Sequence, residues 1–158
     1  FTTVQNKMHY AITGNTAAEI IASRVSSDKP NIGMTHWRGC KPTKEEALIA
    51  KNYLSEQELL VLNNLVEQYL VFAEGQAIQR VPMYMKDWIE KLHGFLELND
   101  KDILHSAGTV SHQLAKERAE KEYSIYAQNS AALPTKTDVD FDAFVSKATS
   151  LVENDKKN

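Results

Sequence analysis

Few residues in this sequence belong to the types that mark specialised protein classes. Its 158 residues include one cysteine, four prolines and six glycines, which excludes collagen-like, low-complexity and disulfide-rich chains. The single cysteine, Cys40, cannot form an internal disulfide, and this fits a reducing compartment. No apolar run approaches the roughly 18–20 residues that a membrane-spanning helix needs, so we expect no such helix.

Neither sign of charge dominates the chain as a whole. The formal net charge is −3, but residues 1–54 carry +3 and residues 55–158 carry −6. A duplex-DNA-binding domain usually has a basic stripe or an isoelectric point above about 9, whereas this chain has a value of about 6.0. We therefore expect no DNA binding by this chain alone, while its positive first third suits an anionic ligand or partner.

The rest of the composition is that of one globular domain. Hydrophobic residues make up 42% and charged residues 25%, which allows a sizeable core at this length. The chain opens with Phe1 and shows no signal-peptide pattern. We therefore expect it to be part of a longer protein.

Helix-start signals recur along the chain. Three Ser/Thr-x-x-Glu sequences predict capping boxes, namely Thr16 with Glu19, Thr43 with Glu46 and Ser55 with Glu58. Together with apolar residues at three- and four-residue steps, they predict helices over 2–12, 17–25, 44–53, 56–79, 84–98, 100–106 and 109–129, and a short one within 138–151. We find no period-2 stretch and no internal repeat.

The longest predicted helix, 56–79, has a broad apolar face. It consists of Leu59, Leu62, Leu65, Val66, Tyr69, Leu70, Ala73 and Ala77. We predict an all-α fold, an irregular multi-helix bundle of about seven or eight helices with one long loop at about 26–42. The helical domain should cover residues 1–133, and residues 134–158 should form a loosely packed helix and tail.

The predicted loop at 26–42 concentrates candidate binding residues. Loops longer than about 12–15 residues are often functional, and this one contains Thr35, Trp37, Arg38 and Lys41. Trp37 either anchors the loop on the bundle or lies exposed as a binding residue. Arg38 and Lys41 would then pair with acidic helices or hold an anion.

Several strings of the sequence resemble the virulence RhuM family, which is encoded in bacterial genomic islands. They are TVQNKMHYAITGNTAAEII (3–21), KPNIGMTHWRG (29–39), AKNYLSEQEL (50–59) and PMYMKDWIEKLHGFLELND (82–100), and 107–126 is similar as well. The resemblance implies the C-terminal half of a virulence-associated protein of the bacterial cytoplasm. The front half would be a phage-type DNA-binding or antirepressor module. No established reaction comes with the family.

A shorter stretch resembles the motif of Fic adenylyl-transferases, His-Pro-Phe-x-x-Gly-Asn-Gly-Arg. His9, Gly14 and Asn15 fall at matching spacing, but Thr16 and Ala17 stand where the motif has Gly and Arg. A helix N-terminus still suits a phosphate, although the charge-assisted grip of the Arg is missing. Alternatively, Gly14 ends one helix and Thr16 caps the next, which explains both residues.

No metal or catalytic set is complete in the sequence. Glu90 and His93 have the spacing of a di-metal bundle ligand pair, but no second copy is present. Cys40 lies near Arg38, Lys41 and His36 without an evident third catalytic member. We therefore predict no metal, no cofactor and no catalytic residue, and the chain is more consistent with a non-enzyme.

Two functions follow from these observations. The first is a helical interaction or oligomerisation domain that forms a homodimer or binds a protein partner, with DNA contacted only through the absent front module. The alternative is a degenerate Fic-like nucleotide-binding or nucleotidyl-transfer domain that uses His9, Asn15, Arg24 and the loop residues 35–41. The alternative requires these residues to converge in one pocket.

Overall fold

The computed structural model describes residues 2–132, and within them all regular structure is helical. This part of the chain contains five α-helices: α1 (Thr2–Thr13), α2 (Ala17–Arg24), α3 (Glu56–Ile78), α4 (Met85–Leu98) and α5 (His112–Ala132). Three short 3-10 helices lie between α2 and α3: η1 (Pro30–Gly33), η2 (Glu46–Leu48) and η3 (Ala50–Tyr53). The all-α prediction is confirmed, whereas the predicted count of seven or eight helices is not matched.

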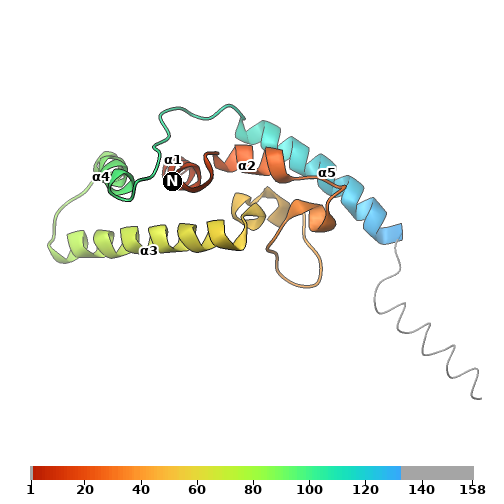
Figure 1. Ribbon diagram of the computed structural model, residues 1–158, viewed down its shortest axis with the longest axis horizontal. Helices are drawn as coiled ribbons and strands as arrows, with labels where there is room; N and C mark the ends of the chain where they lie inside the picture. The colour runs from red at the N-terminus through yellow and green to blue at the C-terminus, as the bar shows by residue number, and fades with distance from the viewer. Residues whose placement is uncertain (1, 133–158) are drawn as a thin grey trace, which may run out of the picture.

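The helices form two neighbouring groups (Figure 1). In one group, α1 packs against both α3 and α4. In the other, α2 lies along α5, and the 3-10 helices pack against these two helices. No helix in residues 2–132 combines the length and the apolar content needed to cross a bilayer.

A single hydrophobic core connects the two groups. Its largest fully buried side chains are Tyr53, Ile20, Ile32, Leu54, Leu92, Leu96 and Val25. Burial of one such side chain contributes roughly 1.5–3 kcal/mol. On α5, the core positions Ala115 and Ala119 are fully buried, and their small size allows a close approach to α2.

An aromatic cluster joins α4 to α3. It consists of Tyr69 and Phe72 on α3 and Trp88 and Phe95 on α4, with ring centroids 5.5–6.4 Å apart. The hydroxyl of Tyr69 also donates a hydrogen bond to the backbone carbonyl of Trp88 at 2.6 Å. The cluster therefore supplies both apolar contact and a directional bond between the helices.

Two of the three predicted capping boxes start α-helices. Thr16 and Glu19 cap α2, and Ser55 and Glu58 cap α3. The third box forms as well, since the carboxylate of Glu46 accepts from the Thr43 amide at 3.0 Å. Only 3-10 turns follow it.

The predicted α-helix at 44–53 is therefore wrong. Ile49 has an extended backbone, with φ −106° and ψ 108°, which separates η2 from η3. The side-chain amide of Asn52 donates to the carbonyl of Glu46, and the hydroxyl of Tyr53 donates to that of Ala47, both at 2.9 Å. These bonds satisfy carbonyls that an α-helix would otherwise pair with backbone amides.

The predicted helix at 100–106 is wrong too. Asp100 is left-handed, with φ 52°, and the Lys101 amide bonds back to the Leu96 carbonyl at 3.0 Å. This terminates α4. The next residues run without helix so that Leu104 becomes buried.

Helix α5 starts three residues later than predicted. One carboxylate oxygen of Glu19 accepts from the amide and the hydroxyl of Thr109, at 2.6 and 2.7 Å. Thr109 is thus bound to α2, and Ser111 caps the helix through the Leu114 amide at 3.1 Å. The predicted helix within 138–151 lies outside the described residues.

The long loop follows α2 and contains one unusual turn, η1. Asn31, Ile32 and Gly33 are all left-handed, with φ of 52°, 60° and 81°. A side-chain carbon placed on Gly33 would collide with the backbone carbonyl oxygen of Arg24. The loop therefore packs closely against the end of α2.

We predict that Gly33→Ala destabilises the domain by roughly 3 kcal/mol or more, because backbone strain and a backbone collision add. Gly39→Ala is the matched control, since Gly39 also has a positive φ, 75°, but open space around it. This variant should lose only about 1–2 kcal/mol. The free energy of unfolding is measured by chemical denaturation, and equal losses in the two variants would contradict the described packing.

Candidate functional site

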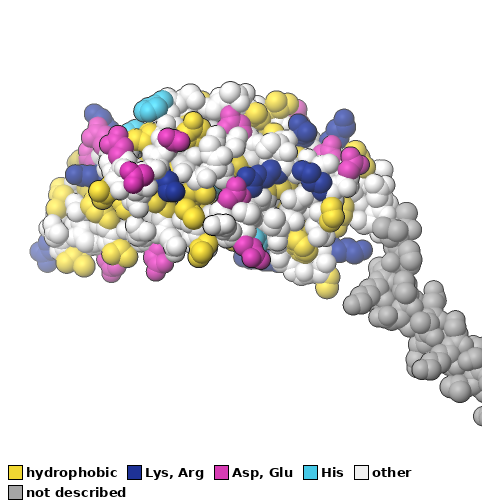
Figure 2. Space-filling view, in the orientation of Figure 1, with side chains coloured by type: hydrophobic (Ala, Val, Ile, Leu, Met, Phe, Trp, Pro, Cys, Tyr) yellow, Lys and Arg dark blue, Asp and Glu magenta, His cyan; other side chains and the backbone are white. Residues whose placement is uncertain are grey.

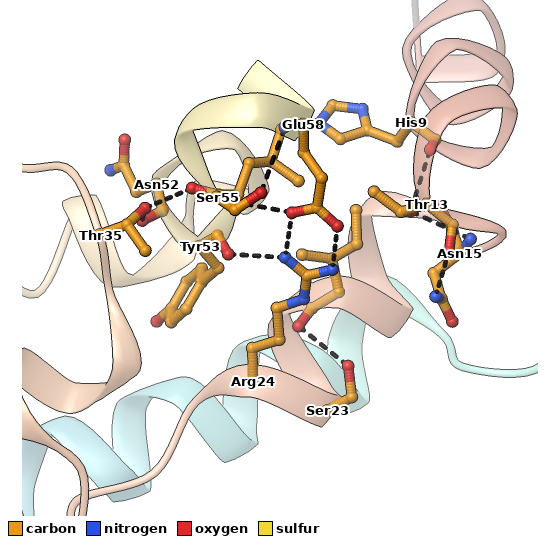
Figure 3. A network of polar contacts seen from close by, with 12 residues as sticks. His9, Thr13, Asn15, Ser23, Arg24, Thr35, Asn52, Tyr53, Ser55 and Glu58 are labelled. Carbon is orange, nitrogen blue, oxygen red and sulfur yellow. Dashed lines mark hydrogen bonds and ion pairs between the residues drawn. The ribbon is translucent and has the colours of Figure 1, made fainter. Parts of the chain in front are cut away.

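Arg24 lies at the centre of a polar network between α2, η3 and α3 (Figure 3). Its Nη1 and Nη2 atoms form a bidentate ion pair with the Glu58 carboxylate at 2.6 and 2.7 Å. Nη1 also donates to the Tyr53 carbonyl at 2.8 Å. Bidentate guanidinium–carboxylate pairs are among the stronger and more specific polar contacts in proteins.

Glu58 is held ionised by these contacts. The Arg24 guanidinium, then the amide of Ser55, lower the pKa of Glu58 to about 2. The same carboxylate completes the capping box of α3. Arg24, a predicted ligand-binding residue, thus serves to join α2 to the first turn of α3, and its charge is already neutralised there.

His9 is buried, with 4% of its surface exposed. Its ring points toward the start of α3 (Figure 3). Nδ1 lies 2.8 Å from the Gln5 carbonyl oxygen, which can only accept, so Nδ1 carries the proton. Nε2 has no hydrogen-bond partner within residues 2–132. Burial lowers the pKa of His9, and the bond to Gln5 offsets this only in part.

Asn15 is engaged in a local turn. Its side-chain amide donates to the Thr13 carbonyl at 2.9 Å, and its backbone amide donates to the Thr13 hydroxyl at 3.1 Å. Between them, Gly14 takes φ 70° and ends α1. The turn thus has the role that the capping interpretation of Gly14 and Thr16 assigns to it.

The loop residues Trp37 and Arg38 line a cavity of about 430 Å³. Trp37 is half-buried and packs against the core, which matches the anchoring interpretation. Arg38 is exposed, and its backbone amide donates to Glu46 at 2.6 Å. The other residues around this cavity are His36, Ile49, Lys51, Asn52 and Leu59.

Thr35 and Lys41 are close in sequence to the residues that line this cavity, but they do not line it themselves. The Thr35 hydroxyl lies 2.5 Å from the Leu54 carbonyl oxygen, so it fastens the loop to the start of α3. Lys41 is exposed. Asn15 lines a different cavity, of about 540 Å³, together with Glu19 and Arg118.

The structure thus separates the predicted site residues. Trp37 and Arg38 line one cavity and Asn15 lines another, whereas His9, Arg24, Thr35 and Lys41 line neither. The nucleotide-binding alternative requires one shared pocket, and this geometry argues against it. Among residues 2–132, no three His, Cys, Asp or Glu side chains are placed to hold a metal ion.

The predicted apolar face of α3 is covered along one edge only. Leu62 and Leu65 are buried, and Leu59 and Tyr69 pack against the core. The other edge is open to solvent: Leu70, for example, is 62% exposed. Figure 2 shows hydrophobic side chains exposed along α3, with acidic side chains between them.

Sequence reasoning identified this apolar face but not its incomplete cover, which depends on where α1 and α4 lie. It also missed Lys7, a cation that is largely buried in the first helix. The signal for the burial of Lys7 was present in part, because this residue lies four positions before the core residue Ala11 and therefore shares its face of the helix.

Comparison with known protein families identifies the chain. The family model described as "Virulence protein RhuM family" matches residues 1–133, a range that contains all five α-helices and every predicted site residue. Neither the curated proteins nor the solved structures give a significant match.

We predict that Arg24→Ala lowers the free energy of unfolding by about 2 kcal/mol, because it removes charge-assisted bonds to two elements. Arg24→Lys should lower the free energy of unfolding by a smaller amount, since an ammonium group cannot reproduce the bidentate geometry. Arg118→Ala, an exposed control, should stay within about 0.5 kcal/mol of the wild type. Equal stability of the Arg24→Ala and Arg118→Ala proteins in urea denaturation would refute this role.

His9 and His93 predict a pH dependence of stability. Burial lowers both pKa values below the ordinary 6.5. As the pH falls, these two histidines therefore bind more protons in the unfolded chain than in the folded protein. Stability should therefore decline between about pH 7.5 and 5.5. His9→Phe should reduce this decline without abolishing it, because His93 still contributes.

The control is His112→Phe, since His112 is exposed and this variant should retain the full decline. Urea denaturation at the two pH values measures the effect. A decline of unchanged size in His9→Phe would show that His9 does not stay neutral in the folded protein.

Proposed function

This chain belongs to the virulence protein RhuM family, and we propose that its helical domain is a self-association module that pairs two copies through α3. The observation that carries the proposal is the uncovered edge of the apolar face on this helix. Helices with apolar residues on most sides are normally buried by other segments of the same protein or by a second chain. A second copy would enclose this one.

The contact residues follow the spacing of a coiled coil. Steps of four and three residues connect Leu59, Asn63, Val66, Leu70, Ala73 and Ala77, here called the α3 stripe. None of them is charged. Asn63, Val66, Leu70 and Ala77 are exposed, and Leu59 and Ala73 are half-buried. The stripe is therefore accessible along most of the helix.

An antiparallel pairing fits the charges at the two ends of α3. With Val66 opposite Leu70 of the second copy, the same register places Glu56 opposite the second copy's Arg80. Both charged side chains are exposed, and neither has an ion-pair partner within residues 2–132. A parallel pairing would instead bring like charges together, and it would align the two helix dipoles unfavourably.

The proposal assigns no reaction to this chain. It places the paired domains in the bacterial cytoplasm, as the family resemblance implies. If a DNA-binding front module is joined to each copy, the pairing would bring two such modules together. This arrangement is common among DNA-binding proteins that recognise two half-sites.

Analytical ultracentrifugation tests the pairing. The wild-type chain should sediment as a dimer, and Leu70→Glu should weaken dimerisation at least tenfold, because two carboxylates would be buried in the stripe. Leu98→Glu is the matched control: Leu98 is 82% exposed at the end of α4 and lies outside the stripe, so the dimer should persist. A wild-type chain that stays monomeric at high concentration would overturn the proposal.

Disulfide trapping tests the orientation in a Cys40→Ser background. When Val66→Cys and Leu70→Cys proteins are mixed and oxidised, the antiparallel register should favour the mixed disulfide over either homodisulfide. Predominant homodisulfides would indicate parallel helices, and the antiparallel arrangement would then be rejected.

A further inference from the structure

Lys7 on α1 is a largely buried cation without a counter-ion among residues 2–132. It is 8% exposed, and its Nζ donates to the backbone carbonyl of Leu104 at 2.6 Å. None of the ion pairs within residues 2–132 includes it. An ammonium group has three donor hydrogens, so the carbonyl satisfies only part of its capacity.

Such an arrangement is unfavourable for the domain alone. Burial of a charge is costly unless a partner of opposite charge compensates it. Consistent with this cost, burial lowers the pKa of Lys7. Titratable groups with environments of this kind are concentrated at functional sites.

A cavity of about 370 Å³ adjoins Lys7. It lies between the start of α1 and the segment that precedes α5, and its lining residues are Thr2, Thr3, Asn6, Lys7, Leu104, His105, Ser106 and Ala107. None of these residues is acidic, and the volume is within the range of small-molecule sites.

Residues with neutral donor groups also line this cavity. The side-chain oxygen of Asn6 accepts from the Ala17 amide at 3.3 Å, which leaves the NH₂ group of Asn6 available to donate. The hydroxyl of Ser106 accepts from the Gly108 amide at 3.3 Å, and its hydrogen is likewise free to donate. The cavity thus combines one charged donor with neutral donors.

Two histidine side chains lie in the same region. His93 on α4 has a buried Nε2 without a hydrogen-bond partner in the described chain. Its pKa is lowered first by burial and then by the nearby charges of Lys7 and His105, while Glu90 and Glu97 oppose this shift more weakly. Three basic groups from separate segments therefore gather around one place in a chain whose net charge is −3.

We propose that this cavity is a binding site for the phosphate or carboxylate group of a small molecule, with Lys7 as its charged donor. Asn6, His105 and Ser106 are the neighbouring side chains that complete it. An oxyanion there would supply the counter-charge that Lys7 lacks. The site is independent of the pairing surface on α3.

The direct test is NMR on the ¹⁵N-labelled wild-type chain. Inorganic phosphate and succinate are titrated separately, and sodium chloride at matched ionic strength is the reference. Saturable shifts of the Leu104, His105 and Ser106 amides are expected with at least one anion, and the stronger response identifies phosphate or carboxylate as the preferred group. No saturable shift with either anion would overturn the proposal.

Variants test the role of Lys7 itself. Lys7→Met should weaken anion binding at least tenfold, whereas Lys116→Met, an exposed control on α5, should bind as the wild type does. If Lys7 only connects α1 to Leu104, Lys7→Met would be destabilised. The proposal instead expects anion-free Lys7→Met to be at least as stable as the wild type. It also expects the anion to raise the Tm of the wild type alone.

Discussion

The arrangement of the domain depends on the ion pair between Arg24 and Glu58. The pair joins the end of α2 to the first turn of α3, and the Tyr53 carbonyl brings the intervening turn into the same contact. Because Glu58 also closes the capping box of α3, one carboxylate determines both where this helix begins and where it is attached. The direction of α3 in turn decides which of its faces meets α1.

The incomplete cover of α3 follows from the lengths of its neighbours. Helix α1 has 12 residues and α3 has 23, so α1 spans about half of α3 at 1.5 Å per residue. Helix α4 adds the aromatic cluster around Tyr69, which covers the same side. The edge with Val66 and Leu70 therefore faces solvent, and the apolar pattern of α3 exceeds what this domain alone can bury.

Local signals in the sequence predicted those helix ends that are set by hydrogen bonds between residues close in sequence. The capping boxes at Thr16 and Ser55 predicted the starts of α2 and α3, and Gly14 predicted the end of α1. The prediction for 44–53 failed because side chains compete with helical backbone bonds there: the hydroxyl of Tyr53 donates to the Ala47 carbonyl. The prediction for 100–106 failed because Asp100 is left-handed. Lys7 donates to the Leu104 carbonyl of that segment across 97 residues, beyond the reach of any local pattern.

The pairing of charged residues could not be predicted from local sequence either. The sequence places a charge of +3 in residues 1–54 but does not show which cations are compensated. In the fold, Glu58 neutralises Arg24, and Glu120 lies 3.3 Å from Lys44. Among residues 2–132, Lys7 has only a carbonyl partner. The positive segment thus supplies Arg24 and Lys44 to ion pairs between separate segments and Lys7 as a buried cation beside a cavity, and this distribution arises only when α1, α3 and α5 are assembled.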